Sequence, residues 1–342
     1  PAGAPTARHA LAPYHTVTLP MTSSTPRTRL FSTCVLLLAA TLWIAGCDLS
    51  ISDDDGITAR TSDVAVANAG AFGAQNSSLT FIDPDTENAS TGDTFPSYIQ
   101  SHILLDNEFL VVFGGTGTLG IFDLETKEQL GQISGIPNPR YVISDSQVAY
   151  VTSQSYSDDT SPAVYVVDLN ERTVVDTIEL DANPEGLTGT SSSLYVATGN
   201  EEGQIVEIDR SDNSIAGTLD PECDAPRRVY VTGQQLLAVA CSGATIYDED
   251  FNVIEETNGA LRILDPRGGT ILDREDLSGQ FTSASAQQRT FYTQARNTLF
   301  AVLEGNTVVR YSTRNGDRSD LQVDGPPIGA IAFDAVNQLL YL

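Results

Sequence analysis

A motif that returns about every 40 residues constrains the fold of this chain more than any other feature. A short run of β-favouring residues ends in aspartate at Asp83, Asp123, Asp168, Asp209 and Asp265, so by subtraction the steps are 40, 45, 41 and 56 residues. Such a period indicates one supersecondary unit repeated along the chain, and four short strands fill roughly 40 residues in one blade of a β-propeller. The period therefore predicts an all-β propeller of four-stranded blades.

Other landmarks keep the same period. Proline cannot donate to a strand ladder, so it marks the point where the chain enters a strand. The units open at Pro96, Pro139, Pro184, Pro226 and Pro327. Runs such as Leu194–Val196 and Thr173–Ile178 then supply an inner and an outer strand, and clusters of Asn, Asp, Gly and Ser supply the turns. No stretch after Cys47 keeps a 3.6-residue hydrophobic period, which favours an all-β chain.

The order of these elements resembles a known repeat family. A proline, then LYVATG (194–199) or its equivalent, VYVVDL (164–169) and TVVDTIEL (173–180) look like the YVTN-type propeller repeat of surface-layer and YncE-like proteins. The resemblance covers roughly 62–342 and is blurred at 221–280, where an insertion around Asp248–Phe251 lengthens the unit. The Trp-Asp dipeptides of WD40 repeats are missing. The resemblance implies the fold and says little about activity, because blade-building residues define the family.

The N-terminal region predicts export. Met21 is the only methionine, so we expect it to be the translation start and residues 1–20 to be upstream sequence. Arginines, an apolar run over 31–44 and Ala45-Gly46-Cys47 follow, which is the pattern of a secretory signal over 21–46. The run is shorter than the ~20 apolar residues of a membrane-spanning helix.

The end of this signal resembles a bacterial lipobox, which implies lipid modification of Cys47; an ordinary signal peptide is the alternative. An acidic flexible tether over 47–62 and a propeller domain over 63–342 complete the expected organisation. The run Asp53–Asp55 resembles an export tag of surface lipoproteins, whereas Asp48 resembles an inner-membrane retention signal. We favour the outer membrane or cell surface.

The charge of the chain restricts its partners. All 45 acidic residues follow Cys47 and three of the 18 basic ones precede it, so the remainder carries 45 − 15 = 30 net negative charges. A field of this sign repels nucleic acid and anionic membrane surfaces. We therefore expect no nucleic-acid partner, and contact with the membrane only through the lipid anchor.

Two cysteines, Cys223 and Cys241, lie within the predicted propeller. The runs Val229–Val231 and Leu236–Ala240 are typical of a hairpin, which would bring Cys241 opposite Pro226 and close to Cys223. In an exported protein this arrangement predicts a disulfide, with two independent buried thiols as the alternative.

Catalytic signals are weak. His102 is the only histidine after Cys47, which excludes a histidine-cluster metal site, and Gly114–Gly120 is best interpreted as a glycine-rich blade turn. Asp83–Glu87 and Asp248–Asp250 offer oxygen ligands but lack the spacing of a calcium loop. We predict no catalytic residue, no metal site and no cofactor, with bound calcium as the alternative. The repeated aspartates are interpreted as turn residues that accept backbone N–H groups, rather than as carboxylates lining a channel.

The sequence thus predicts a lipid-anchored, extracytoplasmic propeller that is a binding or interaction module of the cell envelope and not an enzyme. Its partner would be an envelope protein or a small ligand. The alternative is a lactonase- or hydrolase-like enzyme with carboxylates and a divalent metal at the central channel. The segment 64–83 lacks a first strand, and 328–342 begins a unit and stops within it. Six blades are expected if the two ends share a blade, and seven if the chain continues beyond Leu342.

Overall fold

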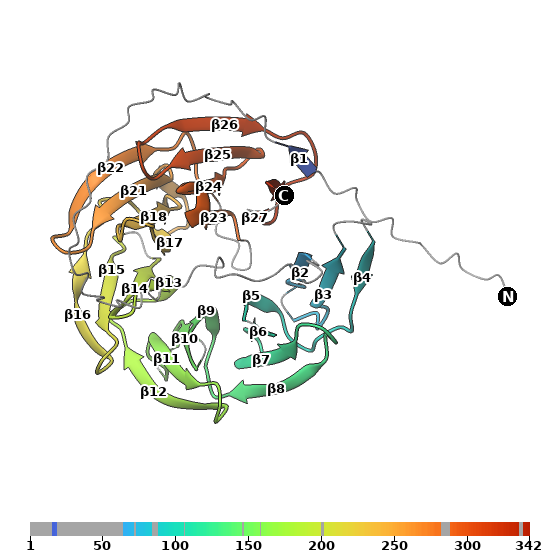
Figure 1. Cartoon of the computed structure of the whole chain (residues 1–342). Coiled ribbons are helices and arrows are strands. Elements are labelled where there is room, and N and C mark those ends of the chain that lie inside the picture. Colours follow the sequence, from blue (N-terminus) through green and yellow to red (C-terminus); the bar gives the residue numbers. More distant parts are fainter. Residues whose placement is uncertain are drawn as a thin grey trace, which may run out of the picture.

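The computed structural model of the chain (Figure 1) describes residues 16–18, 64–71, 73–83, 88–105, 107–145, 147–157, 159–199, 202–281, 288–334 and 338–342. These residues form antiparallel sheets arranged around a ring, and the only helical element among them is the 3₁₀ turn η1 (Gln294–Arg296). The predicted all-β propeller is confirmed. The described residues do not form any helix that has the length and hydrophobicity needed to cross a membrane.

Six blades follow one another from β2 to β26. The first blade has three strands, β2 (Val64–Asn68), β3 (Ser78–Ile82) and β4 (Ala89–Thr91). The second has β5 (Ile99–Leu104), β6 (Glu108–Phe113), β7 (Thr118–Asp123) and β8 (Gln129–Ser134). The third has β9 (Pro139–Ser144), β10 (Val148–Ser153), β11 (Ala163–Asp168) and β12 (Thr173–Glu179).

The fourth blade comprises β13 (Pro184–Gly189), β14 (Ser193–Thr198), β15 (Ile205–Asp209) and β16 (Ser214–Leu219). The fifth comprises β17 (Pro226–Val231), β18 (Leu237–Cys241), β21 (Ala260–Asp265) and β22 (Thr270–Asp276). Between β18 and β21 the chain inserts a separate hairpin, β19 (Thr245–Tyr247) and β20 (Val253–Glu256). The sixth blade comprises β23 (Thr290–Thr293), β24 (Thr298–Val302), β25 (Thr307–Ser312) and β26 (Arg318–Gln322).

A further sheet follows the sixth blade. In it β27 (Ala332–Asp334) pairs with β28 (Leu339–Tyr341), which pairs on its other side with β1 (Thr16–Thr18). The segment that contains β1 is the one expected to lie upstream of the translation start. Six blades from β2 to β26 agree with the prediction of six or seven. The two ends do not share one blade, however, because β2–β4 and β27–β28 belong to separate sheets.

Each complete blade places its first strand at the centre of the ring and its fourth at the rim (Figure 1). Prolines are the first residues of β9, β13 and β17, in agreement with the predicted strand entrances. These innermost strands are the edges of their sheets, where a residue without an N–H is tolerated. The pairing between the third and fourth strands shifts register at the same place in four blades, which is a β-bulge that adds twist to the outer strand.

The hydrophobic core lies between successive blades rather than within one of them. Leu110 and Ile121 of the second blade pack against Val142 and Val151 of the third, and equivalent clusters join each later pair of neighbours. Full burial of such a side chain contributes about 1.5–3 kcal/mol. A blade is therefore stabilised mainly by the two blades beside it.

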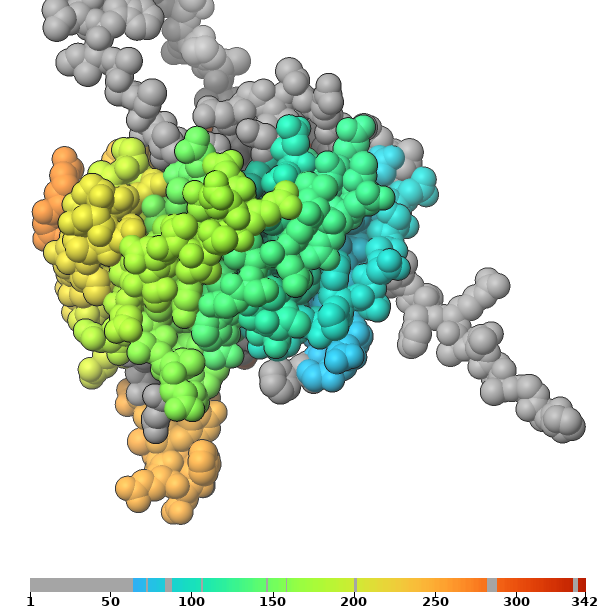
Figure 2. All heavy atoms as spheres, turned by 90° about the horizontal axis from the view of Figure 1, so that it is seen from below, coloured from blue at the N-terminus to red at the C-terminus, as the bar shows by residue number. Residues whose placement is uncertain are grey.

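Because successive strands are antiparallel, the connections of a blade alternate between the two ends of the ring. Each first strand begins at the end where the connections between second and third strands emerge. The inserted hairpin β19–β20 is one of these connections, and it projects well beyond the rest of the disc (Figure 2). We call this end of the propeller the hairpin face.

Candidate binding face

Equivalent positions of four neighbouring blades meet at the centre of the hairpin face. In their sheets Pro139, Pro184 and Pro226 pair with Ser153, Thr198 and Cys241, and Ile99 pairs with Phe113 in the same way. The next residue of each first strand is therefore also equivalent. These four residues are Gln100, Arg140, Glu185 and Arg227.

These side chains form one hydrogen-bonded chain across the blades. Arg140 Nη2 donates to both carboxylate oxygens of Glu185, at 3.0 and 3.2 Å, and its Nη1 donates to Gln100 Oε1 at 3.1 Å. Arg227 Nη1 forms an ion pair with Glu185 Oε1. Only 2% of Glu185 is exposed. A buried carboxylate is tolerated because it is paired with two guanidinium groups.

A loop of the third blade closes this chain toward solvent. Gln154 Nε2 donates to Glu185 Oε1 at 3.0 Å and to the carbonyl of Pro184 at 3.1 Å. The Tyr156 hydroxyl in turn donates to Gln154 Oε1. Tyr156 is 68% exposed, so an aromatic ring stands at the edge of the polar centre.

A further arginine lies one residue deeper along β17. The Arg228 guanidinium carbon is 4.4 Å from the centroid of the Tyr141 ring and 5.7 Å from that of Tyr230. Gly186 makes this approach feasible, since a Cβ there would lie 2.7 Å from Arg228 Cδ. Burial raises the pKa of Tyr141, so its phenol is neutral and its ring face attracts the cation.

We call Arg140, Arg227 and Arg228 the arginine cluster. Glu185 forms ion pairs with Arg140 and Arg227. No carboxylate of the described residues lies within ion-pair distance of Arg228. Its only hydrogen bond to a described residue runs from Nε to the Tyr230 hydroxyl, at 3.4 Å. Three cations thus face one anion at the centre of an otherwise acidic molecule.

The second element of the hairpin face is the β19–β20 hairpin, whose base is held firmly. Ala244 and Thr257 exchange backbone and side-chain hydrogen bonds at 2.8 and 2.9 Å. Gln280 Nε2 donates to the carbonyls of both residues, at 2.9 and 3.0 Å. Gly243, at φ +78°, lies so close to Thr257 that a Cβ would be 2.4 Å from its carbonyl oxygen. The hairpin is therefore a rigid projection at its base.

The outer part of the hairpin exposes apolar side chains. Phe251 is 85% exposed at the tip and Ile254 is 63% exposed on β20, beside the exposed Tyr247 and Val253. Phe251 also adopts φ +62°, a left-handed conformation that is unfavourable for a bulky residue. Asp248 holds the turn, because its Oδ1 accepts the backbone N–H of Asp250 and Asn252 at 2.9 and 2.8 Å. This oxygen, a calcium ligand only in the alternative interpretation of the sequence, therefore accepts N–H groups of its own turn.

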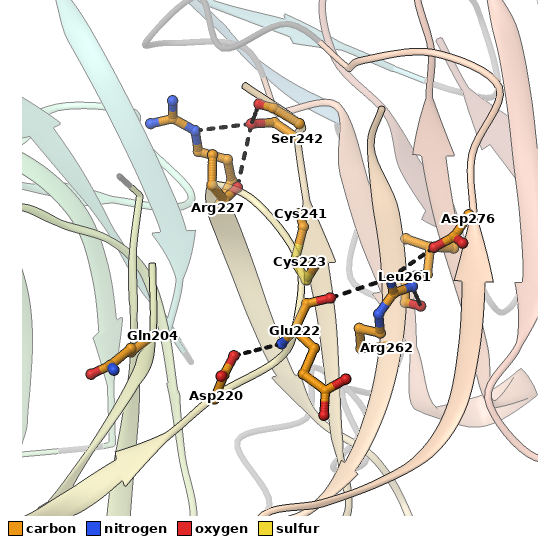
Figure 3. The surroundings of a disulfide bond; sticks show 12 residues. Gln204, Asp220, Glu222, Cys223, Arg227, Cys241, Ser242, Leu261, Arg262 and Asp276 are labelled. Carbon is orange, nitrogen blue, oxygen red and sulfur yellow. Dashed lines mark hydrogen bonds and ion pairs between the residues drawn. A yellow bond between two sulfur atoms is a disulfide. The ribbon is translucent and has the colours of Figure 1, made fainter. Parts of the chain in front are cut away.

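The disulfide candidate lies near Arg227 (Figure 3). Cys223, in the segment that leads into β17, is bonded to Cys241 at the end of β18, with a Cα–Cα distance of 6.1 Å. The adjacent Ser242 accepts a hydrogen bond from Arg227 Nε at 3.3 Å. The bond therefore ties the entrance of β17, which carries two of the arginines, to the strand that precedes the hairpin.

The repeated aspartates lie elsewhere. Four of them end the third strand of a blade, one strand in from the rim and at the end of the ring opposite the hairpin face: Asp123, Asp168, Asp209 and Asp265. Asp123 accepts the N–H groups of Glu125 and Thr126, and Asp168 those of Asn170 and Glu171, at 2.6–3.0 Å. Asp209 and Asp265 accept the N–H two residues further on, at 2.8 and 3.0 Å. Acceptance of the N–H two residues further on is common to all four turns, and none of these carboxylates lines the centre.

These contacts lower the pKa of three of the aspartates. The Thr126 backbone N–H acts on Asp123, the Ser211 hydroxyl on Asp209 and the Arg267 guanidinium on Asp265. Asp83 directly follows β3, and residues 84–87 lie outside the described residues, as do Cys47, the predicted signal peptide and the tether.

The glycine-rich segment and His102, the other residues considered from the sequence, both belong to the second blade. The backbone N–H groups of Gly115 and Thr116 donate to Ser97 Oγ at 2.9 and 3.2 Å, so the glycine-rich segment is a turn between β6 and β7. His102 lies on β5, and burial lowers its pKa. Among the described residues, no three His, Cys, Asp or Glu side chains gather closely enough to hold a metal ion.

The ring of blades defines the protein as a β-propeller. Solved structures with a similar fold are also propellers. The WD40 propeller of Doa1 is similar with a TM-score of 0.60 and 13% identity, over 86% of this chain and 90% of that chain. The WD40 domain of Toxoplasma gondii coronin is similar with a TM-score of 0.59 and 10% identity, over 78% and 70%. A chain of a mitotic checkpoint complex is similar with a TM-score of 0.59 and 15% identity, over 82% and 84%.

Identities this low show the fold alone. No protein-family model matches the chain, and no curated protein matches it. The likeness to WD40 propellers is one of architecture, because the single tryptophan, Trp43, is followed by isoleucine rather than aspartate.

The arginine cluster and Glu185 were not predicted from the sequence. A signal was present, since Arg140, Glu185 and Arg227 each follow the proline that opens a unit. Charged residues directly after a strand-opening proline, at the repeat period, would have indicated a polar centre. Only the hairpin insertion was visible, as an irregular unit at 221–280.

Proposed function

We propose that this propeller is an interaction module and not an enzyme, and that it holds a partner protein on the hairpin face. The observation that carries the proposal is the β19–β20 hairpin, which breaks the repeat and exposes Phe251 and Ile254 at the end of a firmly anchored projection. Large apolar side chains presented together on a projecting element are typical of binding hot spots. The neighbour from a mitotic checkpoint complex is, by its name, part of a protein assembly, which is consistent with this role for the fold.

The charge of the hairpin restricts the partner. Residues 243–259 contain Asp248, Glu249, Asp250, Glu255 and Glu256, and neither lysine nor arginine. The complementary surface is therefore an apolar recess rimmed by basic side chains. A second copy of this chain fits poorly, since two acidic hairpins would repel each other.

The test is site-specific photo-cross-linking combined with affinity. A photoreactive residue at position 251 should yield one discrete adduct from envelope extract, while the same residue at position 272, an exposed leucine on the outer strand β22, should not. Against the partner identified in this way, Phe251→Ser with Ile254→Ser should weaken binding by at least tenfold, and Leu272→Ser should not. Equal adducts at both positions, or unchanged affinity of the double variant, would exclude the hairpin as the contact.

We further propose that the protein is exported and lipid-anchored to the cell envelope, on its outer membrane or surface, and needs no cofactor for binding. The support is the signal pattern over 21–46, the lipobox-like Ala45-Gly46-Cys47 and the YVTN-type repeat resemblance. Metabolic labelling with a fatty-acid analogue tests the anchor. Label should be lost in Cys47→Ser and retained in the matched variant Cys34→Ser; label that persists in Cys47→Ser argues against lipidation there.

A further inference from the structure

We propose that the centre of the hairpin face binds an oxyanion, a carboxylate or a phosphate, through the arginine cluster. The few cations of the chain are unevenly distributed in the structure. After Cys47 the chain has 15 cations against 45 acidic residues, and three of those 15 gather on the first strands of two blades. An acidic protein repels anions over most of its surface. Where it concentrates cations, it attracts anions locally.

The local charges do not balance. Glu185 pairs with Arg140 and Arg227, which leaves Arg228 without a carboxylate partner among the described residues. Arg140 Nε is also buried without a hydrogen-bond partner. The single Glu185 carboxylate acts on all three guanidinium groups, so a bound oxyanion would add a negative charge where cations outnumber anions.

The cluster has the geometry that an oxyanion requires. Arginine presents its donors as a planar fork, which matches the two oxygens of a carboxylate or two oxygens of a phosphate. Glu185 shows that a carboxylate is accommodated beside these arginines, since Arg140 Nη2 donates to both of its oxygens. Arg228 is held in place by Tyr141 and Tyr230, so little side-chain entropy remains to be lost on binding.

The cluster can also be reached from solvent. The Arg227 side chain is 25% exposed, and Arg228 beside it is half-buried. Tyr156 stands exposed at the same edge and offers an aromatic face to whatever carries the anion. This site shares no residue with the β19–β20 hairpin, so it does not depend on the partner proposed above.

The test is titration of the purified protein with sodium phosphate or sodium succinate, each compared with sodium chloride at equal ionic strength. The chloride reference is essential because salt of any kind screens the repulsion of an acidic protein. We expect a saturable rise in melting temperature, and heat of binding in calorimetry, with at least one of the two oxyanions. Phosphate alone would identify a phosphate site, succinate alone a carboxylate site, and both a general oxyanion site.

Variants then assign the residues. Arg228→Met should weaken oxyanion binding at least tenfold, whereas the matched variant Arg267→Met, on an exposed turn, should leave it unchanged. Glu185→Gln should strengthen binding several-fold, because it removes the competing carboxylate. If Arg228→Met fails to fold, Arg228→Lys keeps the charge, loses the fork and should still weaken binding. The proposal is overturned if neither oxyanion exceeds chloride, or if the arginine variant that folds binds as the unaltered protein does.

Discussion

The carboxylates of Asp168 and Glu185 have different roles in this propeller. Asp168 lies in a turn far from the centre and accepts two backbone N–H groups, at 2.8 and 2.9 Å. Glu185 follows a strand-opening proline and is buried between two guanidinium groups. The chemistry of each carboxylate is set by what surrounds it: amide donors of its own turn for Asp168, and cations from neighbouring blades for Glu185.

The turn role of Asp168 can be measured. Asp168→Ala removes the acceptor of two N–H groups and should lower the free energy of unfolding by about 1 kcal/mol. Asp168→Asn keeps the Oδ1 acceptor and should lose clearly less. The urea unfolding midpoints of the two variants provide the comparison, and equal losses would show that the negative charge, rather than the turn hydrogen bonds, is what matters.

At the scale of elements, the fifth blade departs from the others. It carries the inserted hairpin between its second and third strands, and the Cys223–Cys241 disulfide joins the segment that leads into its first strand to the end of its second. Arg262 of β21 also contacts the segment that contains Cys223, since it donates to the Glu222 carbonyl at 3.4 Å. The same side chain pairs with Asp276 at 2.7 Å. Within the part of the chain that the structure describes, the blade that projects the hairpin is therefore the one that carries a disulfide.

The disulfide should stabilise this blade measurably. The sequence separation of the two cysteines is 18, and closing a loop of this size stabilises a protein by about 3 kcal/mol in the chain-entropy model. Cys223→Ser with Cys241→Ser should lower the melting temperature, and reductant should lower that of the unaltered protein but not that of the double variant. A melting temperature that reductant leaves unchanged in both proteins would argue against a stabilising bond.

At the scale of the whole molecule, the charge is divided between surface and centre. The entire chain carries a formal net charge of −27, yet the innermost strands bring Arg140, Arg227 and Arg228 together. The acidic outside keeps the molecule soluble and discourages association with like-charged surfaces. The arginine cluster therefore provides a local attraction for an anion on the hairpin face.

Much of the fold was predictable because its determinants are local. The period of about 40 residues, the prolines and the aspartate turns each act within one blade, through strand propensity and short-range hydrogen bonds. The hairpin insertion was visible as a longer unit, and the proximity of Cys223 to Cys241 followed from the intervening hairpin. The candidate site was not predictable in the same way, since Arg140, Glu185 and Arg227 are 45 and 42 residues apart and belong to three blades.

The sequence by itself thus determined the repeating four-stranded unit, its order and its turns. Only the tertiary structure decided which side chains meet at the centre and which hydrophobic residues stay exposed. The reason is that blades associate through apolar faces buried between neighbours, and the ring formed by this packing brings equivalent positions of separate units together. The sequence of one repeat unit does not show which side chains of the neighbouring blades it will meet. A polar centre built from several blades therefore exists only once the ring has formed.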